Sequence, residues 1–220
     1  MLYAVTDLME EIRVALDNNM SSTALAGIGD VDTLSLDELI RSKIEDAGRL
    51  VVQSAPVSLL GGGKAFGDSI GWDSEAGYGS GHIVLPDDFL RLIVFQMSDW
   101  SIAVSEPITE HDQRYSRQRS RYGGVRGCPQ KPVVAIVQQP IGQVLEFYSC
   151  TAGEHVYVKM ARYAPEPKIS TFEDETVIDL PEKIERAVVY YAAYLVALAT
   201  GQTEQAKACQ AVCQELLGGI

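Results

Sequence analysis

The segment from Asp179 to Leu217, DLPEKIERAVVYYAAYLVALATGQTEQAKACQAVCQELL, contains an unbroken apolar run from Ala187 to Ala199. Asp179, Pro181 and Glu182 are typical of a helix start, with a side-chain cap, a proline in the first turn and a capping box. A helix that is apolar on nearly every side is buried in protein or in a membrane. The run is shorter than the roughly 20 residues that span a bilayer, so we expect a buried helix. Its expected core positions are Ile184, Val188, Tyr191, Leu195 and Leu198.

A second helix is expected directly after the first. Gly201 can take the left-handed conformation that ends helices, and Thr203 can cap the next one. The apolar stripe of this second helix consists of Ala206, Cys209, Cys213 and Leu216. The two form a helical hairpin whose first arm is central, so other elements must surround that arm.

Two more helices are expected near the N-terminus. Apolar residues recur at helical spacing between Val5 and Leu16, which predicts an amphipathic helix over residues 3–18. Ser35 and Glu38 form a capping box that predicts a helix from 35 to about 53. Residues 1–54 and 179–220 therefore supply the four helices of a bundle.

Residues 55–178 have a different character and predict a β-rich insertion. Strand-like runs occur near residues 82–86, 89–100, 132–138, 143–150 and 155–162, with turn sequences between the last three, and residues 100–104 are another strand or an extension of the second run. Thr109 is a possible cap for a short arginine-rich helix to about Ser120. The predicted fold class is α+β: a four-helix bundle with an inserted antiparallel β meander.

Residues 61–81 contain eight glycines, which predicts a flexible loop over Leu60 to Gly81. The Gly61–Lys64 run lacks the spacing of a phosphate-binding loop, and Ala65 replaces the hydroxyl that would bind magnesium. In an assembly, Trp72 and Tyr78 could anchor this loop against a neighbouring protein.

The chain has 220 residues, 46% of them apolar, and a net charge of −12, as expected of a folded, soluble and acidic protein. Such a charge argues against DNA as a general partner. The four cysteines are expected to be buried free thiols, as in a reducing compartment. Because the N-terminus lacks the apolar core of a signal peptide, we expect a cytosolic site of synthesis.

Patterns that would indicate catalysis are not found. His82, His111 and His155 lie in different elements without ligand spacing, so neither a metal nor a cofactor is expected. Asp87 and Asp88 follow Pro86, where aspartate is common for its turn-forming side chain. An enzyme would require a pocket with converging titratable groups, and the sequence does not indicate one.

One segment departs from the acidic composition. Arg114 to Lys131, the arginine segment, holds six of the chain's 18 lysines and arginines, with two interleaved tyrosines. Such a segment can contact an acidic surface of another subunit, follow a nucleic-acid backbone, or be an ordinary solvated face. All three interpretations remain open at this point.

The order of elements resembles that of bacteriophage head-to-tail connector proteins, the adaptor or ring proteins beneath the portal. The resemblance is carried by LPDDFLRLIVFQMSDW (Leu85–Trp100), by the arginine-rich helix and the β meander, and by the terminal helical hairpin Ile184–Leu217. It implies a non-enzymatic virion protein of the phage neck, from a phage or prophage, assembled in the host bacterial cytoplasm.

The resemblance also implies partners: a homo-oligomeric ring, usually dodecameric, with the portal above and a tail protein or second ring below. DNA would pass through the channel without sequence-specific binding, and no membrane is involved. Many members of the family also have a long C-terminal arm that embraces the portal, whereas this chain ends at Ile220. The alternative function is a small nucleic-acid-binding regulator that uses Arg114 to Lys131.

In a ring of identical acidic subunits, basic surface must meet acidic surface at each contact. The arginine segment is the concentrated basic surface, and Glu173 to Glu175 is an acidic run near a predicted loop. The candidate residues for a contact with a neighbour or with the portal are therefore Arg114, Arg117, Arg119, Arg121, Arg126, Glu173, Asp174, Glu175, Trp72 and Tyr78.

Overall fold

A computed structural model describes residues 1–16, 35–67, 69–73, 79–120, 122, 124–151 and 156–218. The chain divides into two compact units, a helical unit (Met1–Gly61 with Glu166–Ile220) and a β unit (Gly62–Pro165). The described residues form five α-helices and eleven strands in three sheets. The predicted fold, four helices with one inserted meander, is therefore wrong, because strands occur in both units and form more than one sheet.

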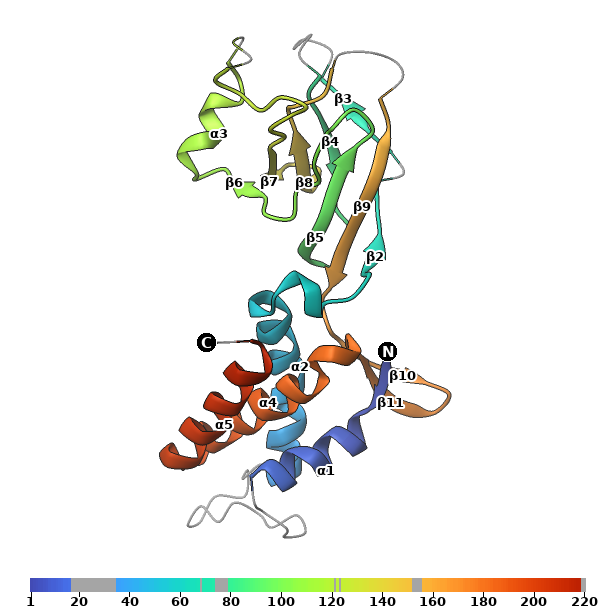
Figure 1. Cartoon of the computed structure of the whole chain (residues 1–220). Helices are drawn as coiled ribbons and strands as arrows, with labels where there is room; N and C mark the ends of the chain where they lie inside the picture. Colours follow the sequence, from blue (N-terminus) through green and yellow to red (C-terminus); the bar gives the residue numbers. More distant parts are fainter. Residues whose placement is uncertain are drawn as a thin grey trace. The chain divides into compact units, whose positions relative to one another are not determined.

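The helical unit is organised around α4 (Glu185–Ala199), which packs against α1 (Val5–Ala15), α2 (Leu36–Ser54) and α5 (Thr203–Leu216) (Figure 1). Two short 3-10 helices, η1 (Val57–Leu59) and η2 (Glu182–Ile184), follow α2 and precede α4. The helical hairpin is thus α4 and α5, and its first arm has the central position that its composition predicts.

The buried face of α4 is made mainly of small side chains. Ala192, Ala193 and Ala197 are completely buried, as small residues allow where helices approach closely. Among the five expected core residues, Ile184 and Val188 are buried, whereas Tyr191 and Leu195 are half-buried. Leu198 is 47% exposed, so its assignment to the core is wrong. An all-round apolar sequence does not tell which side faces the neighbouring helices, and here the alanines do.

Helix starts were predicted with mixed success. Ser35 and Glu38 form the capping box of α2, which confirms that prediction. The predicted cap at Asp179 is wrong: Asp179 ends a strand, and its carboxylate accepts a hydrogen bond of 2.8 Å from the amino group of Met1. Thr203 is likewise the first residue of α5 and makes no capping hydrogen bond.

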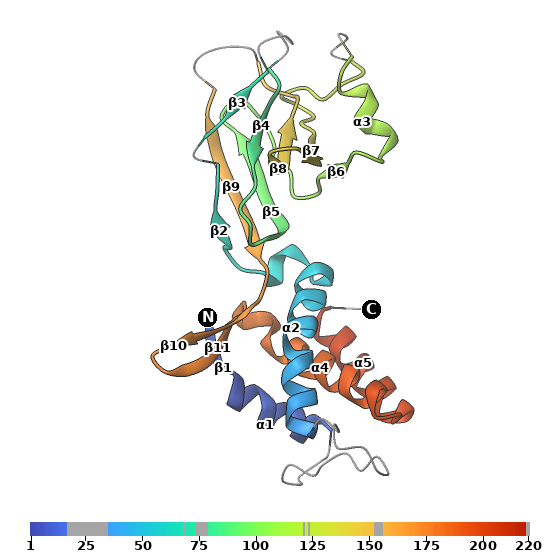
Figure 2. The same cartoon turned by 180° about the vertical axis from the view of Figure 1, so that it is seen from behind.

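The helical unit also contains a three-stranded antiparallel sheet in the order β1 (Leu2–Ala4), β11 (Glu175–Asp179), β10 (Ile169–Phe172). β1 takes up residues that were predicted to begin the first helix. The β10–β11 hairpin, predicted as part of the insertion at 55–178, belongs to the helical unit because β11 pairs with β1. It extends away from α2, α4 and α5 in both views (Figures 1 and 2).

The β unit consists of two sheets. One has the order β2 (Lys64–Ala65), β9 (Val158–Pro165), β5 (Phe89–Met97), and the long β5 and β9 lie side by side (Figure 2). The other has the order β3 (Gly71–Trp72), β4 (Gly81–Val84), β8 (Gly142–Phe147), β7 (Val134–Gln139), β6 (Ile108–Thr109). The short helix α3 (Gln113–Arg117) follows β6.

Strand pairing corrects the expected meander. β7 and β8 do form a hairpin, but β9 does not pair with β8 and instead pairs with β5 of the other sheet. Phe95 and Trp100 share a core with Leu145 and Phe147, and the rings of Phe95 and Phe147 stack at 6.0 Å. Burial of this shared core favours two facing sheets over one continuous meander.

The glycine-rich stretch is not a single flexible loop, because it contains β2 and β3. Gly63 has a φ of 59°, and a Cβ there would lie 2.4 Å from the carbonyl oxygen of Tyr163. At Gly79, with a φ of 65°, a Cβ would lie 1.9 Å from the carbonyl oxygen of Cys150. These glycines allow close approach of two backbones, which a composition alone does not distinguish from flexibility.

Candidate interaction surface

The arginine segment is anchored to the β unit through α3. Asp112 caps this helix by accepting a 2.8 Å hydrogen bond from the backbone N–H of Arg114, so the helix starts at Gln113 and not near Thr109. The guanidinium of Arg114 also binds the Asp112 carboxylate, at 2.7 Å. The Arg114 side chain and backbone N–H lower the pKa of Asp112 to about 2. The carboxylate therefore stays charged, and the cap persists, across the physiological pH range.

A carboxylate network fixes α3 on the sheet. Tyr115 on α3 donates a 3.0 Å hydrogen bond to Glu146 on β8, and Tyr148 donates to the same carboxylate. Gln139 on β7 donates a third hydrogen bond, at 2.7 Å. Burial, reinforced by the bond to Glu146 and by its charge, strongly raises the pKa of Tyr148. Both tyrosines therefore remain neutral donors, and the helix is held in one position.

Gln118 fixes the chain that follows α3. It is almost fully buried, its side-chain amide donates to the carbonyl of Arg114, and its amide oxygen accepts a 2.8 Å bond from the N–H of Gly127. A Cβ at Gly127 would collide with the hydroxyl of Ser149. The start and the end of the arginine-bearing stretch are thereby held against the same sheet.

The arginines differ in their surroundings. Arg117 and Arg119 are exposed, and no ion pair found among the described residues involves either of them. The side chain of Arg119 hydrogen-bonds to the hydroxyl of Tyr115. Arg126 is half-buried, and Arg121 lies outside the described residues. Exposed apolar groups accompany them: Tyr122 is 76% exposed and Val125 50%.

The acidic candidates form the tip of the β10–β11 hairpin. Phe172 pairs with Glu175, and Glu173 and Asp174 make the two-residue turn between them. Their φ angles are 48° and 67°, which is the left-handed region that a primed hairpin turn requires. All three carboxylates are exposed, and Phe172 beside them is 53% exposed.

The two aromatic candidates of the glycine-rich stretch are Trp72 and Tyr78. Trp72 is 42% exposed and packs edge-on against Phe147, with ring centroids 5.4 Å apart. It is therefore already part of the β unit and not a free anchor on a loop. Tyr78 lies outside the described residues.

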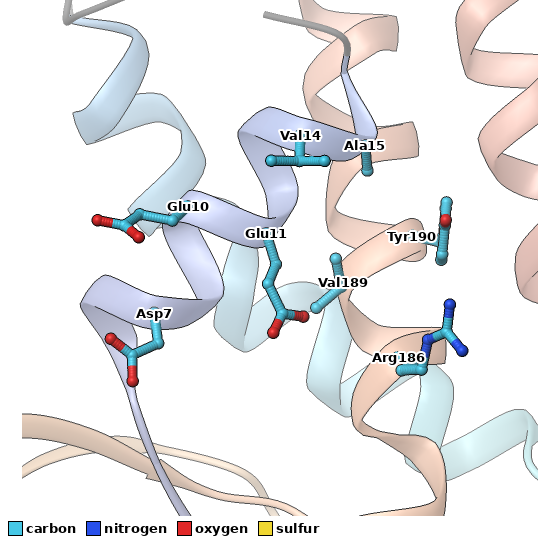
Figure 3. A pocket seen from close by; sticks show the side chains of 8 residues that line it. All are labelled: Asp7, Glu10, Glu11, Val14, Ala15, Arg186, Val189 and Tyr190. Atoms are coloured by element: carbon cyan, nitrogen blue, oxygen red, sulfur yellow. The ribbon is translucent and has the colours of Figure 1, made fainter. Parts of the chain in front are cut away.

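A groove of about 680 Å³ lies between α1 and α4 in the helical unit (Figure 3). Asp7, Glu10 and Glu11 line it from α1, and Arg186 and Tyr190 line it from α4. Burial and the nearby charge of Glu11 raise the pKa of Glu185, the residue just before Arg186. The groove is acidic, with one balancing arginine among these residues.

Asp88 and the histidines were considered as catalytic groups in the sequence, and Asp88 has clear structural partners. Asp88 accepts hydrogen bonds from Lys64 at 2.8 Å and from Tyr163 at 2.6 Å. Burial opposes ionisation of Asp88, but these two donors outweigh it and lower its pKa. His82 lies 3.8 Å from Asp73, His111 is largely exposed, and His155 lies outside the described residues. Within the described ranges, no cluster of acidic, histidine or cysteine side chains could hold a metal ion.

The cysteines are free, and Cys150, Cys209 and Cys213 are buried. Burial raises the pKa of Cys150 to about 12 and that of Cys213 to about 11, so both thiols are protonated at neutral pH. None of the helices in the described part of the chain combines the length and the apolarity that a bilayer crossing requires.

Comparison with known proteins adds no family. No protein-family model matches the chain, and a search of curated proteins found no match. The surfaces described above and the resemblance carried by the sequence are therefore what indicate a function.

Proposed function

We propose that this protein is a structural subunit of a phage or prophage head-to-tail connector ring, which joins the portal to the tail and continues the DNA channel. The observation that carries the proposal is the exposed pair Arg117 and Arg119, which α3 and the residues directly after it present on the β unit of a chain whose net charge is −12. The parts of the resemblance that lie in Leu85–Trp100 and in the terminal helical hairpin support the same conclusion.

Assembly of like-charged subunits has an electrostatic cost. Copies with a charge of −12 repel one another, and this repulsion opposes closure of a ring unless oppositely charged surfaces meet at each contact. Arginine suits such a contact because its planar fork binds carboxylates in pairs and it stays charged when partly desolvated. The network around Glu146 positions α3 in advance, so little conformational entropy is lost when a partner binds.

A ring subunit needs no catalytic site, and we propose that this protein has no enzymatic activity. The partners would be further copies of the chain, the portal above, and a tail protein or second ring below. An acidic channel wall would repel DNA phosphates and let the duplex slide.

The test compares purified wild-type protein with an Arg117→Glu variant by sedimentation velocity and negative-stain electron microscopy, with and without a purified phage portal protein. We expect rings or portal-bound density for the wild type and loss of both for the variant. Arg41→Glu on α2 is the matched control, because Arg41 is also exposed and the charge change is identical.

A gel shift with a 30-base-pair duplex at low salt distinguishes the proposed ring function from the alternative, a nucleic-acid-binding regulator. Salt-sensitive DNA binding by a single chain, lost in Arg117→Glu and without any ring, would contradict the proposal and favour a nucleic-acid-binding regulator.

A further inference from the structure

The tip of the β10–β11 hairpin combines features of a docking element. β10 is an edge strand of its three-stranded sheet, so one side of its backbone has no strand partner among the described residues. Phe172 is 53% exposed next to three exposed carboxylates. No ion pair among the described residues involves Glu173, Asp174 or Glu175.

The turn itself does not require these carboxylates. Asn-Gly forms a primed two-residue turn most readily, because both central residues have positive φ. Glu173 has a φ of 48°, which is uncommon for glutamate, and Asp174 has a φ of 67°, which aspartate tolerates better than most residues. A neutral Asn-Gly pair would therefore suit this turn at least as well as Glu173 and Asp174.

We infer that the β10–β11 hairpin of one copy docks on the arginine surface of the next copy, defined by Arg117, Arg119, Tyr122 and Val125. This inference rests on the proposed ring function and names the partner of its basic surface. Glu173 and Glu175 neutralise Arg117 and Arg119, while Phe172 covers the exposed side chains of Tyr122 and Val125.

Charge complementarity indicates that the arginine surface binds a second copy of the chain. Among the described residues, neither the carboxylates of the hairpin tip nor the guanidinium groups of Arg117 and Arg119 make an ion pair, and each set lies beside exposed apolar or aromatic side chains. The acidic groove between α1 and α4 is a weaker candidate, because Arg186 already provides a cation there. The two surfaces differ, so the contact is head to tail, and repetition of such a contact closes a ring.

The test is a charge-swap mixing experiment on the full chain. One variant carries Arg117→Glu and Arg119→Glu, and the other carries Glu173→Lys and Glu175→Lys. Each alone places like charges at every contact and should lose at least tenfold in ring yield by negative-stain counting. In an equimolar mixture the two variants can alternate around a ring. Each contact then joins either two wild-type surfaces or two reversed surfaces, so opposite charges meet everywhere and rings should form again. Raising the salt concentration should weaken wild-type rings as well, because exposed charges are screened.

A third variant isolates the carboxylates from the hairpin fold. Glu173→Asn with Asp174→Gly preserves the turn, so the thermal midpoint should not fall, while ring yield should drop. Disulfide trapping gives a readout that does not need a stable ring: Arg117→Cys mixed with Glu173→Cys should give a cross-linked dimer under oxidation, whereas Arg41→Cys with Glu173→Cys should not.

The outcomes distinguish the two proposals. Rings that form normally from both charge-reversed variants, with no specific cross-link, would overturn the hairpin contact and leave the ring function standing. Rescue only when all four reversals are in one chain would show a contact within a chain and would also overturn the inference. A wild-type chain that neither associates nor cross-links, alone or with the portal, would overturn both.

Discussion

Replacing Gly63 with alanine tests whether the glycine-rich stretch is a packed part of the β unit. An L-residue in the left-handed conformation costs about 1–2 kcal/mol, and Gly63 has a φ of 59°. The new Cβ would also lie 2.4 Å from the Tyr163 carbonyl oxygen and 2.4 Å from the Cδ1 of Ile93. Relief of such overpacking costs about 1–3 kcal/mol, so the variant should lose roughly 2–5 kcal/mol in total.

Gly61→Ala is the matched control. Gly61 has a φ of 68°, but nothing lies within 4 Å of its virtual Cβ, so only the conformational cost of about 1–2 kcal/mol applies. The difference between the two variants therefore measures the close approach to Tyr163 and Ile93.

The assay is urea unfolding followed by tryptophan fluorescence. Both tryptophans, Trp72 and Trp100, lie in the β unit, which contains Gly63, whereas Gly61 is the last residue of the first segment of the helical unit. Circular dichroism is therefore recorded in the same titration, so that unfolding of both units is followed. Gly63→Ala should unfold at a clearly lower urea concentration than Gly61→Ala. Equal midpoints would refute the reasoning and show that the stretch behaves as the flexible loop that its composition suggests.

Three further outcomes are expected. Val196→Asp places a charge in the α4 core and should unfold the helical unit, whereas Leu198→Asp should change its stability by less than about 0.5 kcal/mol in circular dichroism melts. Tyr148→Phe removes one donor from Glu146 and should lower the free energy of unfolding by about 1–3 kcal/mol in urea titrations. Burial and Asp88 raise the pKa of Tyr163 to about 12 from an unfolded value of 10.0. Its stabilisation is thus complete below pH 10 and lost towards pH 12, and Tyr163→Phe should flatten the decline of stability in that window.

The residues of the surfaces proposed for assembly could be selected from the sequence, but the contacts that hold these residues in place could not. Clustering of arginines is a property of the sequence, so Arg117 and Arg119 could be selected without a structure. Arg114 is paired with Asp112 only two residues away, but the attachment of α3 to Glu146, on a strand far along the chain, depends on tertiary contacts. The same holds for the hairpin that presents Glu173.

The sequence by itself determined features that depend on neighbouring residues. The capping box of α2 and the glycine that ends α4 were predicted correctly, and so were three of the four stripe residues of α5, because their hydrogen bonds and side-chain spacing span a few residues. The fourth stripe residue, Leu216, is half-buried. The β7–β8 hairpin was predicted for the same reason.

Tertiary structure alone decided which strands pair and which faces are buried. β9 could pair with β8 or β5 by its pattern, and burial of the aromatic core between two sheets selected β5. Asp179 could cap a helix, but pairing of β11 with β1 made it the end of a strand. Local preferences amount to about 1 kcal/mol or less for each residue, and the burial of a core exceeds them.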